Sequence, residues 1–166
     1  MRAWTKTTAT AVLFLSLLIA GCALPPKGVN AKFEDASTWR GRLAVRVDTA
    51  QPQSFSAGFE LTGSALAGEM TLFNPLGGTA AILTWDAQTA TMRVNGDVQH
   101  FQSLGELINR AVGTEIPVGA LFAWLAGDIV VAEGWSPDLS QHASGRITAK
   151  RMDPAPSVEL RLVLDN

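Results

Sequence analysis

The sequence is poor in the residues that build disulfides and metal sites. It contains one cysteine, Cys22, and two histidines, His100 and His142. A single cysteine excludes an internal disulfide, and the two histidines stand in no recognisable metal-ligand spacing. Lysine and arginine number 13 against 15 aspartates and glutamates, a formal net charge of −2, without a block of like charge. This balance excludes the basic stripe that nucleic-acid-binding proteins need.

Motifs of the common catalytic sites are also absent. No G-x-S-x-G nucleophile elbow occurs. Gly63 and Gly68 have the glycine spacing of a phosphate loop, but Glu69 and Met70 follow where such a loop needs lysine and serine or threonine. Acidic residues are spread singly, so nothing forces two of them together for acid–base chemistry. The sequence therefore predicts no catalytic residue, no metal site, no cofactor and a protein that is not an enzyme.

An export signal stands at the N-terminus. A short basic start precedes an apolar run from Ala9 to Ala20, and small residues lead into Cys22. This pattern is typical of a secretory signal, and the run is shorter than the roughly 20 residues that a transmembrane helix needs. The Ala-Gly-Cys ending resembles the lipobox of bacterial lipoproteins. The resemblance implies cleavage of residues 1–21, lipidation of Cys22 and, with Ala23 in second place, sorting to the periplasmic side of the outer membrane.

The rest of the chain divides into a tether and one domain. Residues 22–38 contain Pro25-Pro26 and Lys27-Gly28 and show no periodicity, which is typical of a lipidated tether. Residues 39–166 are enough for a single domain with a real core.

Alternation of apolar and polar residues predicts that most of this domain is β-structure. One apolar face on each segment indicates antiparallel strands that are half buried and half solvated. Turn residues lie between the segments, and Asn95-Gly96 is a strong hairpin signal. The alternating strands span residues 42–47, 54–61, 69–73 and 158–164. Two runs of β-favouring residues, 79–85 and 91–95, predict further strands.

Two helices interrupt the strands. Ser103 and Glu106 form an S-x-x-E capping box that begins a helix ending at Gly113. A second helix lies within Pro117–Ala126 and ends at Gly127. Strands, two helices and strands in this order predict a mainly β fold with some α, in which the helices cover the open side of one curled antiparallel sheet.

Large apolar side chains on these elements fit two interpretations. They either fill a core or line a cavity for an apolar ligand, and periodicity does not distinguish the two. We expect that some of the shared apolar space is open to ligand. The residues expected to line it are Val45, Phe59, Leu61, Met70, Leu72, Leu121, Trp124 and Leu125.

The segment from Phe73 to Thr79 predicts an exposed turn between two strands. Asn-Pro and Gly-Gly are turn signals, and turns lie at the surface. Leu76 occupies its tip. An exposed leucine is unremarkable in general, but on a membrane-tethered protein it has a second interpretation, which is contact with lipid.

Three segments together resemble the LolB family of outer-membrane lipoprotein receptors. They are Trp39-Arg40-Gly41-Arg42-Leu43-Ala44-Val45, then Phe73-Asn74-Pro75-Leu76-Gly77-Gly78-Thr79, and Ile116-Pro117-Val118 with Leu121 and Trp124-Leu125-Ala126-Gly127. The resemblance implies an unclosed antiparallel β-barrel, two or three helices as its lid and an apolar cavity for acyl chains. It also implies that the loop Pro75, Leu76 and Gly77 is exposed and needed for membrane insertion.

The resemblance further implies a function and partners. A monomeric LolB-like protein would accept lipoproteins from a periplasmic carrier of the LolA type and insert them into the inner leaflet of the outer membrane. Its partners would be the carrier, the acyl chains of the cargo and outer-membrane phospholipid, with no nucleic acid. Two alternatives stay open: a lipoprotein that binds another lipid or glycolipid, and a structural scaffold lipoprotein.

The sequence departs from the family pattern in two places. Phe59-Glu60-Leu61 lacks an aromatic residue that the family often has there, and the chain stops at Leu164-Asp165-Asn166 without a final tryptophan. These departures leave open whether one or two late strands are shortened or missing.

Overall fold

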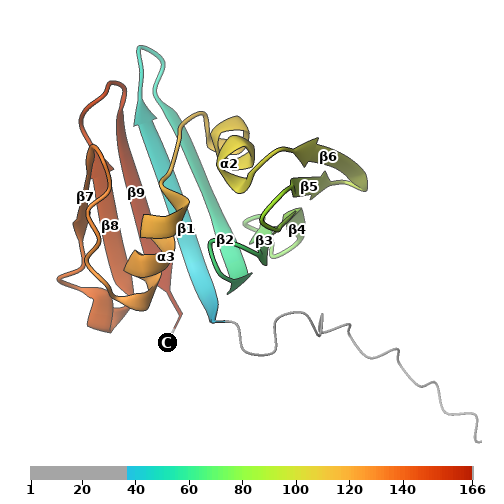
Figure 1. Ribbon diagram of the computed structural model, residues 1–166, viewed down its shortest axis with the longest axis horizontal. Coiled ribbons are helices and arrows are strands. Elements are labelled where there is room, and N and C mark those ends of the chain that lie inside the picture. Colours follow the sequence, from blue (N-terminus) through green and yellow to red (C-terminus); the bar gives the residue numbers. More distant parts are fainter. Residues whose placement is uncertain (1–36, 166) are drawn as a thin grey trace, which may run out of the picture. The chain divides into compact units, whose positions relative to one another are not determined.

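One antiparallel sheet dominates the computed structural model, which describes residues 37–165. Its nine strands lie in the order β6-β5-β4-β3-β2-β1-β9-β8-β7. The edge strands β6 and β7 do not pair with each other, so the sheet is open, as predicted (Figure 1). The strands are β1 (Thr38–Asp48), β2 (Gln53–Gly63), β3 (Gly68–Phe73), β4 (Thr79–Trp85), β5 (Ala90–Val94), β6 (Asp97–Phe101), β7 (Trp135–Asp138), β8 (Arg146–Arg151) and β9 (Ser157–Leu164).

The six predicted strands are all present, and β1 begins at Thr38, the last residue of the predicted tether. Three further strands, β6, β7 and β8, were not predicted. Four of the five residues of β6 are exposed, so this edge strand has no apolar face to detect. The four-residue β7 contains Pro137, which the edge of a sheet tolerates because one side of it needs no ladder hydrogen bond. Three strands thus follow the helices, and β7 is the shortest of them.

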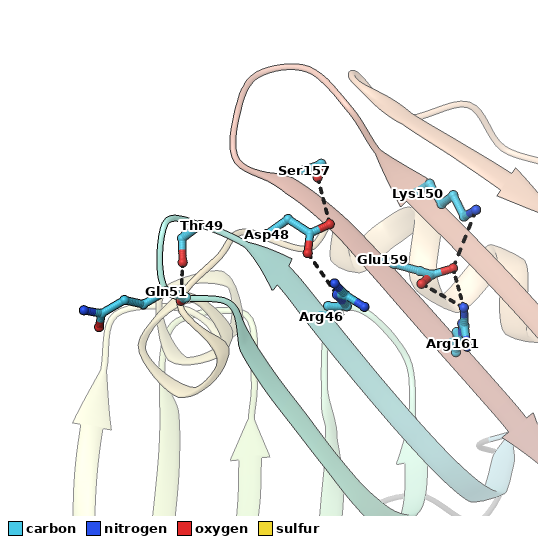
Figure 2. Close-up of polar contacts among 8 residues, drawn as sticks. All are labelled: Arg46, Asp48, Thr49, Gln51, Lys150, Ser157, Glu159 and Arg161. Carbon is cyan, nitrogen blue, oxygen red and sulfur yellow. Dashed lines mark hydrogen bonds and ion pairs between the residues drawn. The ribbon is translucent and has the colours of Figure 1, made fainter.

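The sheet has an apolar inner face and a polar outer face. On β1, Val45 and Val47 are buried on the inner face, while Arg42 and Arg46 are exposed on the outer one. Figure 2 shows ion pairs of the outer face, in which Arg46 meets Asp48, and Lys150 and Arg161 share Glu159. Such exposed pairs contribute only about 0–1 kcal/mol each, so the buried inner face supplies most of the stability.

Gly41 explains part of the Trp39–Val45 motif. A Cβ atom at this position would lie 2.0 Å from the carbonyl oxygen of Val163 on β9. Only glycine therefore lets β1 and β9 approach this closely.

Two helices cover the inner face. They are α2 (Leu104–Val112) and α3 (Val118–Ala126), and together we call them the lid. In Figure 1, α3 crosses in front of β1 and β9. Both helices end as predicted, at glycines in the left-handed conformation: Gly113 with φ 76° and Gly127 with φ 91°.

The predicted capping box begins α2. Glu106 donates its backbone N–H to the hydroxyl oxygen of Ser103 (3.1 Å). Its carboxylate in turn accepts a hydrogen bond from the backbone N–H of Gln102 (2.8 Å), one residue before the cap. The Ser103 side chain thus satisfies one backbone donor of the first turn, as predicted. The Glu106 side chain satisfies the donor of Gln102 just before the cap, in place of the predicted bond to Ser103 itself.

We expect Ser103→Ala to destabilise the protein by about 1 kcal/mol, the usual cost of losing an N-cap side chain. Chemical unfolding of the purified variant measures this loss. Ser136→Ala is the matched control, because Ser136 is exposed on β7 and its side chain makes no hydrogen bond within residues 37–165. Equal stability of the Ser103 variant and the wild type would contradict the role given to the cap.

Candidate functional site

An apolar cavity lies between the inner face of the sheet and the lid. Its volume is about 80 Å³, and every residue that lines it is apolar. The structure places seven of the eight residues expected at a cavity around this one space: Val45, Phe59, Leu61, Met70, Leu72, Leu121 and Leu125. The side chains come from strands and from the lid alike, so lid and sheet form the cavity together.

Trp124, the eighth residue, does not line the cavity. Its side chain is fully buried, its indole N–H donates to the carbonyl oxygen of Val130 (2.9 Å), and its ring packs on Trp135 with centroids 6.0 Å apart. Helical spacing placed Trp124 on the same face as Leu121 and Leu125. The tryptophan ring nevertheless reaches sideways into the core, where it supports α3 against the β7 end of the sheet.

Nine further residues, which the sequence did not single out, also line the cavity. Phe55 shares a strand face with Phe59, and Leu160 and Leu162 belong to the alternating pattern of β9, so period-two spacing would have identified them. Those from α2 required knowledge of how the helix rotates over the sheet. The nine are Leu43, Phe55, Leu83, Ile108, Ala111, Val112, Ile116, Leu160 and Leu162.

The cavity is small for a ligand site. Small-molecule sites usually measure about 300–1,000 Å³, several times the 80 Å³ found here. The strands are joined by backbone hydrogen bonds, whereas α2 and α3 pack on the sheet mainly through apolar side chains. A long acyl chain is therefore larger than this cavity, and apolar packing between lid and sheet bounds the space.

A structured loop joins β3 to β4 next to the cavity wall. Leu76 at its tip is 95% exposed, the highest value among the large hydrophobic side chains of residues 37–165. The side-chain oxygen of Asn74 accepts hydrogen bonds from the backbone N–H groups of Leu76 (2.9 Å) and Gly78 (3.0 Å). Gly77 adopts a φ of 82°, in the left-handed region that suits glycine. Hydrogen bonds within the loop thus fix its backbone, and the side chain of Leu76 points away from the protein.

The two histidines lie on different elements of the structure. His100 is exposed on β6, and the ring nitrogen Nε2 of half-buried His142 lies 3.1 Å from the carbonyl oxygen of Leu125 near the end of α3. Across residues 37–165, no three histidine, cysteine or acidic side chains come together as metal ligands. In the same range no helix combines the length and the apolar character needed to cross a membrane.

The predicted lipidation site, Cys22, lies outside the described residues, together with the predicted signal peptide and nearly all of the predicted tether. The cavity and the loop are therefore the parts of the predicted site that the structure places.

Comparison with known proteins gives a consistent family. The family model described as "Outer membrane lipoprotein LolB" matches residues 36–152. The chain is 33% identical to the Outer-membrane lipoprotein LolB of Bordetella pertussis over 92% of its own length and 89% of that protein. It is 25% identical to the protein of that name from Bordetella petrii, covering 90% and 88% of the two chains. The LolB of Shewanella woodyi is 33% identical over 75% of this chain and 60% of its own.

Proposed function

The chain belongs to the LolB family of outer-membrane lipoproteins, and from this premise we propose that it receives lipoproteins from a periplasmic carrier and inserts them into the inner leaflet of the outer membrane. The observation that carries the proposal is the position of Leu76. A 95% exposed leucine stands on a braced loop that directly continues β3, a strand whose Met70 and Leu72 line the apolar cavity. Strand β3 thus connects the proposed acyl-chain cavity to the loop that is proposed to contact the membrane.

The proposed cycle follows from these parts. The lid opens, and the acyl chains of the cargo enter between α3 and the sheet, where Val45, Leu61 and Leu160 line the path. Each acyl methylene that is kept from water stabilises the complex by about 0.8 kcal/mol. This gain offsets the contacts between lid and sheet that are lost when the chains enlarge the cavity. Leu76 then enters the bilayer and holds the protein at its surface, and the acyl chains pass from the cavity into the lipid. Because every step moves acyl chains toward a more favourable apolar environment, the cycle needs no nucleotide and no catalytic residue.

Two alternatives share part of this geometry. A scaffold lipoprotein needs no cavity, and the wholly apolar 80 Å³ void between lid and sheet argues against it. A carrier for another lipid would use the cavity equally well. Such a carrier has no need of a braced leucine exposed to solvent, and this feature favours the insertion receptor.

A reconstituted transfer reaction tests the proposal. A purified carrier loaded with a lipoprotein is mixed with vesicles that contain this protein, and the cargo is then sought in the floated vesicles. We expect cargo in the vesicles without added nucleotide, and none when the vesicles lack the protein. Cargo that stays on the carrier in both cases would contradict the proposal.

We also propose that Cys22 is the anchor. The expectation is that Cys22→Ser yields uncleaved precursor or soluble protein, because a chain without its lipids has only weak surface contacts with a membrane. Fractionation of cells detects this change, and mass spectrometry of the wild-type mature protein detects the lipids. Ser37→Ala, a change in an exposed residue just before β1, is the control that should leave fractionation unchanged. An unmodified Cys22 in the wild type would disprove the anchor.

A further inference from the structure

Arg42, beside the Leu76 loop, is an arginine without a side-chain partner among residues 37–165. The outer face of β1 carries Arg40, Arg42 and Arg46. Arg40 donates to the carboxylate of Glu60 (2.9 Å), which raises the pKa of Arg40, and Arg46 donates to that of Asp48 (2.9 Å; Figure 2). Arg42 has no hydrogen bond or ion pair from its side chain to any residue within 37–165.

The strand register explains why Arg42 has no partner on the neighbouring strands. Its neighbours across the sheet are Gly58 on β2, which has no side chain, and Val163 on β9, whose side chain cannot accept a hydrogen bond. Gly58 in turn pairs with Phe73, the last residue of β3 before the loop. Because Gly58 has no side chain, open space remains on the outer face between Arg42 and the loop.

This space is a groove of about 370 Å³, which we call the Arg42 groove. Arg42 and Ser56 contribute polar groups to it, Phe73 contributes an apolar wall, and Pro75 and Gly77 form its end. Leu76 lies between these last two residues and is itself outside the groove. The groove therefore opens at the base of the tip that carries the exposed leucine.

The chemistry of the groove suits a phosphate group. A guanidinium presents planar N–H donors that match phosphate oxygens in a bidentate arrangement, and the hydroxyl of Ser56 is a further donor. Interfacial apolar anchors enter the boundary between headgroups and acyl chains by about 5–10 Å. Neighbouring Cα atoms are about 3.8 Å apart, so a groove that begins one residue from an immersed Leu76 lies near the depth of the phosphates.

We propose that the Arg42 groove binds the phosphate of a phospholipid headgroup in the membrane that Leu76 enters. The inference rests on the proposed function and deepens it, because it names a polar contact that would hold the loop at the surface. Free phosphate offers the same chemistry. The phospholipid is favoured because the groove is open, has an apolar wall and adjoins the exposed leucine.

The test measures how often the loop docks on a membrane. The mature lipidated protein is labelled with a fluorophore at Ala80→Cys, an exposed position at the start of β4, and reconstituted in vesicles of phosphatidylcholine and phosphatidylglycerol. Nitroxide on a fraction of the headgroups quenches the fluorophore when the loop is docked. We expect Arg42→Gln to lower the ratio of docked to undocked protein about tenfold, as the loss of a hydrogen-bonded contact between a guanidinium and a phosphate predicts.

Arg46→Gln is the matched control. It removes the same charge from the same face of the same strand, at a position where Asp48 already engages the arginine, and it should leave quenching unchanged. Equal losses from both variants would show diffuse charge attraction, and no loss from either would show that Arg42 makes no contact; both results overturn the proposal. If Leu76→Glu abolishes docking while Arg42→Gln has no effect, the proposed function stands and only the phosphate site fails.

A second arm separates the two sources of phosphate. Inorganic phosphate, supplied at the same total phosphate concentration as the vesicles, is titrated into the labelled protein before vesicles are added. We expect no saturable change in fluorescence and no loss of later docking. Saturable binding of inorganic phosphate that Arg42→Gln removes would assign the groove to free phosphate and overturn the phospholipid proposal.

Discussion

Replacing Leu76 by glutamate should leave a folded receptor that accepts cargo and fails to deliver it. Leu76 is 95% exposed, and surface substitutions of this kind usually change stability by less than about 0.5 kcal/mol. Immersing a leucine contributes about 1.5–3 kcal/mol, and an unpaired carboxylate in apolar surroundings is strongly disfavoured. We therefore expect incorporation of cargo into vesicles to fall about a hundredfold, while transfer from carrier to receptor stays near the wild-type level.

The chain offers a matched control in Leu66→Glu. Leu66 is 72% exposed in the turn between β2 and β3, at the opposite end of β3 from the Leu76 loop. The same change there should leave both assays intact. If Leu76→Glu also inserts cargo normally, Leu76 is only a turn residue. If transfer, insertion and the thermal transition are all lost together, the leucine contributes to the fold and the role given to the loop is wrong.

Filling the cavity should block the earlier step. Val45 is 3% exposed, and its side chain faces the void between β1 and the lid. Val45→Phe places a ring in space that acyl chains are proposed to use. Because the existing void can receive part of the ring, we expect a stability loss of about 1 kcal/mol, at the low end for enlarged core residues. Acceptance of cargo from the carrier should fall about tenfold, since chains must then displace a well-packed side chain.

Val163→Phe separates the cavity from the general effect of added bulk. Val163 is on the outer face of β9 and is 47% exposed, so the same added atoms meet solvent there. Acceptance is measured by pull-down of the receptor with labelled cargo, at temperatures where each variant is folded. Normal acceptance by folded Val45→Phe would show that cargo does not occupy this cavity.

The contrast between the two variants defines their separate steps. Val45→Phe should lose acceptance and, as a consequence, insertion. Leu76→Glu should lose insertion alone. If both variants lost acceptance and insertion to the same extent, the cavity and the loop would not act in separate steps.

Local patterns were sufficient to predict the loop and the lid termini. Asn-Pro and Gly-Gly turn chemistry placed Leu76 at the surface, and the Ser103 and Glu106 pair placed the start of α2, because both features depend on residues close together in sequence. Four strands followed from period-two alternation, and those predicted at residues 79–85 and 91–95 followed from runs of β-favouring residues, for the same reason. The edge strand β6 escaped prediction because its residues are nearly all exposed and therefore carry no alternation.

Properties that depend on distances between elements could not be predicted. Helical spacing grouped Trp124 with Leu121 and Leu125, but the length of the indole and its hydrogen bond to Val130 turn it into the core. The cavity volume depends on how closely the lid approaches the sheet, which no periodicity encodes. The Arg42 groove likewise follows from strand register, since Gly58 and Val163 become neighbours of Arg42 only once β2 and β9 flank β1.

Depletion of the protein in its own cell tests the central proposal most directly. Membranes are separated after depletion, and outer-membrane lipoproteins other than this one are located by quantitative mass spectrometry. We expect these lipoproteins to leave the outer membrane and accumulate on the carrier or in the inner membrane. Leu76→Glu should fail to restore them, whereas Leu66→Glu should succeed. Lipoproteins that keep their normal place in the outer membrane throughout depletion would contradict the proposed receptor function.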